Sequence, residues 1–166
     1  MKRLVLIISM IWLCLPIWAG IHSYAENSVL RKGKIIKIRV SETGVHCIPY
    51  DTLKSWGLQP EQVRVLGYGG NMLSENFLLK KWDDLPSVAF YMHKGSDNTF
   101  NSGDYILFYA RGAVKWEYSG GRWRHTQHPY SLYGYYFVSD SAGEQNLITK
   151  AEPLNGDGAY TVDWNM

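Results

Sequence analysis

Short apolar runs separated by glycine-containing turns recur along most of this chain and restrict it to a small set of β-folds. The clearest run is 34–40, where Ile36, Ile38 and Val40 alternate with basic residues. Such alternation is typical of a strand with one buried and one solvated face. The chain holds 12 Tyr, 7 Trp and 5 Phe, and aromatic residues favour pleated, half-buried surfaces. The pattern predicts an all-β fold.

Strand signals follow one another at short intervals along the chain. Further strands are expected at 45–48, 63–66, 87–93, 105–110, 115–118, 122–125, 133–138 and 146–149. The turn at 41–44 predicts that the first two strands form a hairpin, and the turn at 119–121 predicts a second hairpin. The run 105–110 is apolar on both faces, which places it in the middle of the sheet system. We expect a β-sandwich of about eight short antiparallel strands.

One short helix is expected as an insert in this β-fold, from Asp51 to Trp56. Asp51 lies in its first turn, where a negative charge is favourable. Leu53 and Trp56 share one face of the helix. Gly57 follows as a left-handed cap that ends the helix.

The first 25 residues have the layout of a secretory signal. Lys2 and Arg3 precede an apolar run over 4–18, and Ala25 offers a small residue at the cleavage position. The run is short for a membrane span. We therefore expect a signal peptide at 1–25, a β-sandwich domain at 26–152 and the start of a linker at 153–166; an uncleaved N-terminal anchor is the alternative. The protein would be exported to the periplasm or the outer-membrane surface, with no transmembrane span after cleavage.

Charge and cysteine content exclude several classes of protein. The formal charge is +2, and cleavage removes Lys2 and Arg3 but no acid. The neutral remainder lacks the basic surface on which nucleic-acid affinity depends, so no nucleic-acid partner is expected. Cys14 follows bulky residues, which disfavours a lipid anchor, and it leaves with the signal. Cys47 then stands alone, expected as a small buried residue rather than as half of an intermolecular disulfide.

Two histidine-containing segments are candidates for chemistry. His46 and Cys47 are neighbours in a predicted strand, where adjacent side chains point to opposite faces, so they cannot share a proton as a nucleophile and base. His125 and His128 are three residues apart in a strand that leads into a turn. No third ligand type is evident near them, and a solvated loop is favoured over a metal site.

Three loops could also be taken for ligand sites. Asp97, Asn98, Asn101 and Asp104 could hold calcium, but their spacing does not match an EF-hand, and a turn is favoured. The glycine-rich stretch 67–70 lacks a following helix, so it is predicted to be a turn rather than a phosphate cradle. The adjacent acids at 83–84 are expected to be solvated. No catalytic residue, metal site or cofactor is predicted.

The predicted hairpin at 115–125 carries aromatic residues among charged ones. Trp116 and Tyr118 alternate with Lys115 and Glu117, and Trp123 lies between two arginines. These rings could pack over the sandwich, bury against another domain or stack on sugar rings. Trp116, Tyr118 and Trp123 form the candidate interface.

Several segments, in this order, resemble the N-terminal region of the PorU-type sortases of the type IX secretion system. These are cell-surface proteins with a gingipain-like cysteine peptidase domain. The segments include VRVLGYGG at 63–70 and GDYILFYA at 103–110. The others lie at 33–40, 43–46, 50–57, 83–86, 112–116, 128–131 and 133–137. The resemblance covers nearly the whole chain after the expected signal peptide.

The resemblance implies an N-terminal β-domain followed by a peptidase domain that would still lie ahead. In the family, the catalytic Cys and His belong to that peptidase domain, and neither His46 nor Cys47 matches them. The chain is thus expected to be a non-catalytic accessory domain of an endopeptidase that removes C-terminal sorting signals from secreted cargo. Its partners would be a gingipain-like peptidase domain, in cis or from an adjacent gene, and other type IX secretion components. The alternatives are a propeptide-like inhibitory domain and a stand-alone carbohydrate-binding or adhesion module.

Overall fold

The computed structural model describes residues 24–76, 79 and 82–149. The expected signal peptide, apart from Tyr24 and Ala25, and the expected linker lie outside these residues. The described part contains nine strands, one α-helix and two short 3-10 helices. In chain order these are η1 (Val29–Arg31), β1 (Ile35–Val40), β2 (Gly44–Pro49), α2 (Tyr50–Ser55), η2 (Pro60–Gln62), β3 (Arg64–Leu66), β4 (Ser87–Val88), β5 (Phe90–His93), β6 (Tyr105–Ala110), β7 (Val114–Ser119), β8 (Arg122–Gln127) and β9 (Gly134–Ser139).

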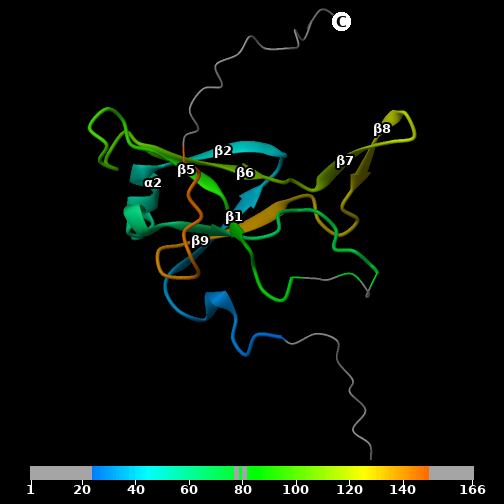
Figure 1. Cartoon of the computed structure of the whole chain (residues 1–166), viewed down its shortest axis with the longest axis horizontal. Helices are drawn as coiled ribbons and strands as arrows, with labels where there is room; N and C mark the ends of the chain where they lie inside the picture. Colours follow the sequence, from blue (N-terminus) through cyan, green and yellow to red (C-terminus); the bar gives the residue numbers. More distant parts are fainter. Residues whose placement is uncertain (1–23, 77–78, 80–81, 150–166) are drawn as a thin grey trace, which may run out of the picture.

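The strands form two packed sheets and a separate hairpin. Sheet A has the order β1-β9-β3-β4, and sheet B has the order β2-β6-β5. All pairings between named strands are antiparallel. In Figure 1, β2 and β6 of sheet B lie over β1 and β9 of sheet A. The fold is the expected all-β sandwich with one short helix, and β6 is the middle strand of its sheet, as predicted.

The core lies between the two sheets and is closed at one end by α2. Alternate residues of each strand point inward, as the pleat requires. The fully buried side chains include Val65 and Val138 from sheet A, Phe90, Ile106 and Phe108 from sheet B, and Leu53 from α2. Burial of each such side chain stabilises the fold by about 1.5–3 kcal/mol. The sequence alternation therefore reflects one shared core.

Helix α2 ends as the sequence predicts. The Gly57 amide donates to the carbonyl of Lys54 at 2.8 Å, and the φ of Gly57 is +70°. This left-handed conformation is the one that glycine adopts without a steric penalty. Leu53 is fully buried, and Trp56 packs partly buried against the core. No helix in the described ranges is long and apolar enough to cross a membrane.

The predicted hairpin of the first two strands is wrong. Strand β1 pairs with β9 in sheet A, whereas β2 pairs with β6 in sheet B. The turn between them crosses from one sheet to the other, and the Thr43 hydroxyl accepts a hydrogen bond from the Gly112 amide at 2.9 Å. Val40 and Ile48 can then enter the core from opposite sides. Burial of both strands across one core outweighs the local tendency to form a hairpin.

Two other strands differ from the prediction. The expected strand at 87–93 is divided at Ala89, so that β4 belongs to sheet A and β5 to sheet B. The expected strand at 146–149 makes only an isolated parallel bridge between Leu147 and Phe90. The second hairpin is confirmed as β7 and β8. Its central residues, Gly120 and Gly121, have φ of 61° and 75°, as a type I′ turn requires.

Several backbone segments meet closely at Arg111, where the chain leaves β6 for the hairpin. The Arg111 amide donates to the hydroxyl of Tyr136 at 2.7 Å, and its carbonyl accepts from the Gly70 amide at 2.9 Å. Burial raises the pKa of Tyr136, which keeps the hydroxyl protonated. A Cβ atom on Gly134 would lie 2.2 Å from the Arg111 carbonyl oxygen, and one on Gly69 would lie 2.8 Å from it. Only glycine permits these approaches.

The substitution Gly134→Ala is expected to lower the free energy of unfolding by about 2 kcal/mol or more, because its methyl group would overlap backbone that cannot move independently. The matched control is Gly44→Ala, since a Cβ there meets no atom within 4 Å. The control should be neutral or stabilising by up to about 1 kcal/mol. Urea unfolding measures the stability of both variants. Equal midpoints would contradict this account of the close backbone approach at Arg111, which we call the backbone crossing.

Candidate functional site

The hairpin of β7 and β8 extends away from the sandwich (Figure 1, yellow-green) as a two-stranded sheet of its own. Every residue of β8 is exposed, and in β7 only Val114 is partly buried. The exposed fractions of Trp116, Tyr118 and Trp123 are 60%, 63% and 67%. The alternative in which these rings pack over the sandwich is therefore wrong. The three rings are available to another molecule or domain.

Pairing between the strands gathers the rings on one side of the hairpin. Tyr118 lies opposite Trp123, and Trp116 lies opposite His125. Their ring centroids are 5.4 Å and 5.0 Å apart. Residues directly opposite in an antiparallel pair share a face, so the four rings form one surface, which we call the aromatic platform. The other face carries charged side chains, namely Lys115, Glu117, Arg122 and Arg124.

His125 belongs to this surface, although the candidate interface predicted from the sequence contained only Trp116, Tyr118 and Trp123. The two-residue glycine turn sets the register of the hairpin, and that register places His125 beside Trp116. The position of His125 could therefore have been predicted from the sequence. Counting the paired residues outward from the Gly120–Gly121 turn places His125 opposite Trp116.

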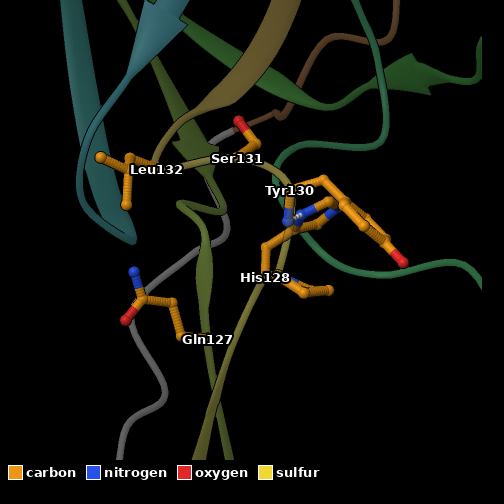
Figure 2. Close-up of a pocket in the computed structure, with 6 residues that line it drawn as sticks. Gln127, His128, Tyr130, Ser131 and Leu132 are labelled. Carbon is orange, nitrogen blue, oxygen red and sulfur yellow. Dashed lines mark hydrogen bonds between the residues drawn. The ribbon is translucent and has the colours of Figure 1, made fainter.

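Two grooves flank the base of the hairpin. One, of about 400 Å³, runs from Trp116 along Lys115 to Arg111 and Tyr109 of the sandwich. The other, also about 400 Å³, lies along the connection from Gln127 to Leu132 (Figure 2). The aromatic platform thus adjoins concave surfaces on the domain body rather than standing apart from it.

The two histidines of this region have separate roles. The Nδ1 atom of His128 accepts a hydrogen bond from the Tyr130 amide at 3.1 Å, and the two rings meet edge to face (Figure 2). His125 instead packs against Trp116. Within the described residues, no group of three or more His, Cys, Asp or Glu side chains could hold a metal ion.

His46 and Cys47 lie on opposite faces of β2, as the strand pattern predicts. The ring of His46 packs 6.0 Å from that of Phe108, and its Nε2 lies 3.1 Å from the Glu42 carbonyl oxygen. Cys47 points outward and is exposed. The expectation of a buried thiol is therefore wrong, because β2 is an edge strand whose inward positions are taken by His46 and Ile48.

The oxygen-rich loop at 97–104 is a turn held by its own side chains, as favoured. Asp97 accepts from the Thr99 amide at 3.0 Å and from the Asn101 side chain at 2.9 Å. These bonds lower the pKa of Asp97. Asp104 is buried and accepts from the Asn101 amide at 2.8 Å. These side-chain bonds hold the loop as a turn.

The acids at 83–84 fasten the N-terminal segment to the domain, contrary to the expectation that they are simply solvated. The Asp84 carboxylate accepts from the Ser28 hydroxyl at 3.0 Å and from the Val29 amide. The Asp83 carboxylate accepts from the Ala25 amide. The expected cleavage position therefore lies beside this tether.

The Asp84 carboxylate is held in its ionised form. Partial desolvation would raise the pKa of Asp84, but the hydrogen bonds from the Val29 and Leu85 amides and the Ser28 hydroxyl outweigh it and lower the pKa below its usual value. Charged acceptors of this kind form the stronger hydrogen bonds. The tether is consequently strongest at neutral pH.

The fold defines a β-sandwich domain with an exposed aromatic hairpin. The chain is similar to the dimeric latent PorU from Porphyromonas gingivalis in its crystal structure, with a TM-score of 0.67 and 31% sequence identity. The similarity covers 84% of this chain but only 12% of the PorU chain. No protein-family model and no curated protein matches the chain. The structure is thus related to one region of PorU.

The substitution Asp84→Asn tests the tether. We expect a loss of about 1 kcal/mol in the free energy of unfolding at pH 7, because the variant lacks the charge and one acceptor oxygen of this half-exposed group. The pKa of Asp84 is lower in the folded state than its ordinary value of about 4. Its contribution to the free energy of unfolding is therefore present above that ordinary pKa and is lost as the pH falls through the folded pKa. Denaturant unfolding from pH 7 to pH 2 should show the difference from wild type shrinking, whereas the exposed control Glu144→Gln should show little difference. A constant difference across this range would contradict the account.

Proposed function

We propose that this chain is an N-terminal accessory β-domain of a type IX secretion system sortase, exported to the cell surface after cleavage behind Ala25. The observation that carries the proposal is the similarity to a region of PorU at 31% identity over 84% of the chain. The likeness extends to sequence as well as fold. The full protein would be a gingipain-like cysteine endopeptidase that removes C-terminal sorting signals from secreted cargo.

In this proposal the chain contributes no bond-breaking group. Cys47 and the histidine next to it in the sequence, His46, point to opposite faces of β2. A nucleophile needs its base within hydrogen-bond reach. The catalytic Cys and His would belong to the peptidase domain, in cis or from an adjacent gene, and this domain would bind and position that partner or other type IX secretion components.

The aromatic platform is the proposed interface with that partner. Trp and Tyr are enriched at the centres of protein interfaces, where their burial contributes much of the affinity. A two-stranded hairpin is marginally stable alone in water. Contact with a second domain would both bury these rings and stabilise the strands that carry them.

An inhibitory, propeptide-like role is the second candidate, and the latent state of the similar PorU structure favours it. Addition of the purified chain to the peptidase domain distinguishes the two roles. Slower turnover at micromolar concentration supports inhibition, whereas unchanged turnover with retained binding supports an accessory role. A carbohydrate-binding module would instead retain glycans in a pull-down that Trp123→Ala abolishes.

Loss of the platform rings should weaken binding to the peptidase domain. For Trp116→Ser with Trp123→Ser, we expect at least a tenfold increase in Kd, since central Trp side chains contribute about 2 kcal/mol each or more. The control pair Arg124→Ser and Thr126→Ser alters the opposite face of the same hairpin. Calorimetric titration measures all three proteins. An unchanged Kd for the Trp variant, or an equal loss for the control, would contradict the proposed interface.

The isolated chain should not cleave a sorting-signal peptide. Thiol-dependent cleavage that survives purification to homogeneity and disappears in Cys47→Ser would overturn the proposed non-catalytic role.

A further inference from the structure

The edge of β7 that faces away from β8 is a free strand edge. Strand β8 occupies the other edge, and the Ala113 carbonyl continues that contact by accepting from the His128 amide at 2.8 Å. No described strand pairs with the outer edge of β7. In an antiparallel pair, every second residue directs its amide and carbonyl away from the partner strand. This edge therefore offers a row of backbone donors and acceptors.

The free edge of β7 has little protection against pairing. Proteins usually guard such an edge with proline, a bulge or charged side chains. Strand β7 contains no proline, and its register with β8 is unbroken from Val114 to Ser119. Its only charged residues, Lys115 and Glu117, form an ion pair with each other. The edge is thus open to another strand.

A groove of about 400 Å³ runs along this edge, between β7 and the sandwich. Val114, Lys115 and Trp116 line it, and these consecutive side chains alternate between the two faces of the hairpin. A groove bordered from both faces lies along the edge of the strand. No described residue of β8 lines it, whereas Tyr109 and Arg111 form the opposite wall. We call this feature the β7 groove.

The β7 groove has a positive lining with aromatic surface on each wall. Arg111 and Lys115 line it, and no Asp or Glu of the described residues does. Lys115 is engaged by Glu117, whereas Arg111 is exposed and forms no ion pair with any described acid. A guanidinium can bind a carboxylate through two parallel hydrogen bonds. Tyr109 on one wall and Trp116 on the other are both exposed. The groove suits an extended segment with acidic and apolar side chains.

We propose that an extended acidic segment of a partner protein adds to β7 as a third strand, with a carboxylate on Arg111 and apolar side chains against Tyr109 and Trp116. In this mode of recognition, backbone hydrogen bonds give affinity and the side-chain contacts give specificity. A third strand would also stabilise a hairpin that has only two. The inference rests on the proposed role of the hairpin as an interface, and it adds the chemistry of the segment that binds there.

Synthetic peptides test strand addition directly. The probe is a capped heptapeptide, Thr-Val-Asp-Val-Glu-Val-Thr, and a second peptide replaces both acids with lysine. Two further peptides carry N-methyl groups, either on the valines or on the aspartate and glutamate. Each set blocks one edge of the extended peptide, because the amides of alternate residues point to the same edge. NMR titration of the isotope-labelled chain, followed at the amides of β7, gives each Kd.

The protein variants are Arg111→Gln and the matched control Arg122→Gln. Arg122 lies on β8 and does not line the β7 groove. Both substitutions keep the backbone, including the Arg111 amide and carbonyl that hold the backbone crossing. Far-UV circular dichroism checks that each variant keeps the sandwich.

We expect the acidic peptide to bind wild type and Arg122→Gln equally, and Arg111→Gln about tenfold more weakly. The lysine peptide should also bind wild type about tenfold more weakly or worse. One N-methylated peptide should lose binding, and the other should retain it.

Binding that survives both sets of N-methyl groups would overturn strand addition. Equal Kd values for the acidic and lysine peptides, or for Arg111→Gln and wild type, would overturn the assigned chemistry. Absence of binding at millimolar acidic peptide would overturn the proposal as a whole. Titration with the peptidase domain tests the sortase assignment separately, so each proposal can fail without the other.

Discussion

The backbone crossing at Arg111 is the constraint on which the rest of the structure depends. There the Arg111 amide and carbonyl are held by the Tyr136 hydroxyl and the Gly70 amide, in a space that only glycines leave open. The crossing joins sheet A to the end of β6 and directs the chain out of the sandwich. As a result, the hairpin that follows shares no strand pairing with either sheet. The exposed position of the aromatic platform is therefore a consequence of the fold.

The domain has a continuous buried core, but its surface exposes several large aromatic side chains. One continuous core joins both sheets and α2, so the sandwich has the interior of an independent domain. Its surface nevertheless leaves the aromatic platform exposed. In the proposed function, a second domain would cover these rings. The exposed hairpin on a complete core also agrees with the similarity to one region of the much longer PorU chain.

Local features of the fold could be predicted from the sequence, whereas long-range ones could not. The run 105–110, the cap at Gly57 and the turn at Gly120–Gly121 each follow from the preferences of a few neighbouring residues. The pairing of β1 with β9 does not, because it is decided by a core that strands distant in sequence share. The same limit explains why Cys47 was expected to be buried and why the tether at Asp84 was missed. Each depends on a partner far away in the chain.

Hydrogen exchange of the hairpin amides tests the central claim most directly. It is measured in the isolated chain and in the intact protein or complex isolated from cells. If this is an accessory domain completed by a partner, residues 114–127 should exchange rapidly in the isolated chain and at least tenfold more slowly in the assembly. The core strands β6 and β9 should be protected in both. Hairpin exchange that is the same in the two samples would contradict the account.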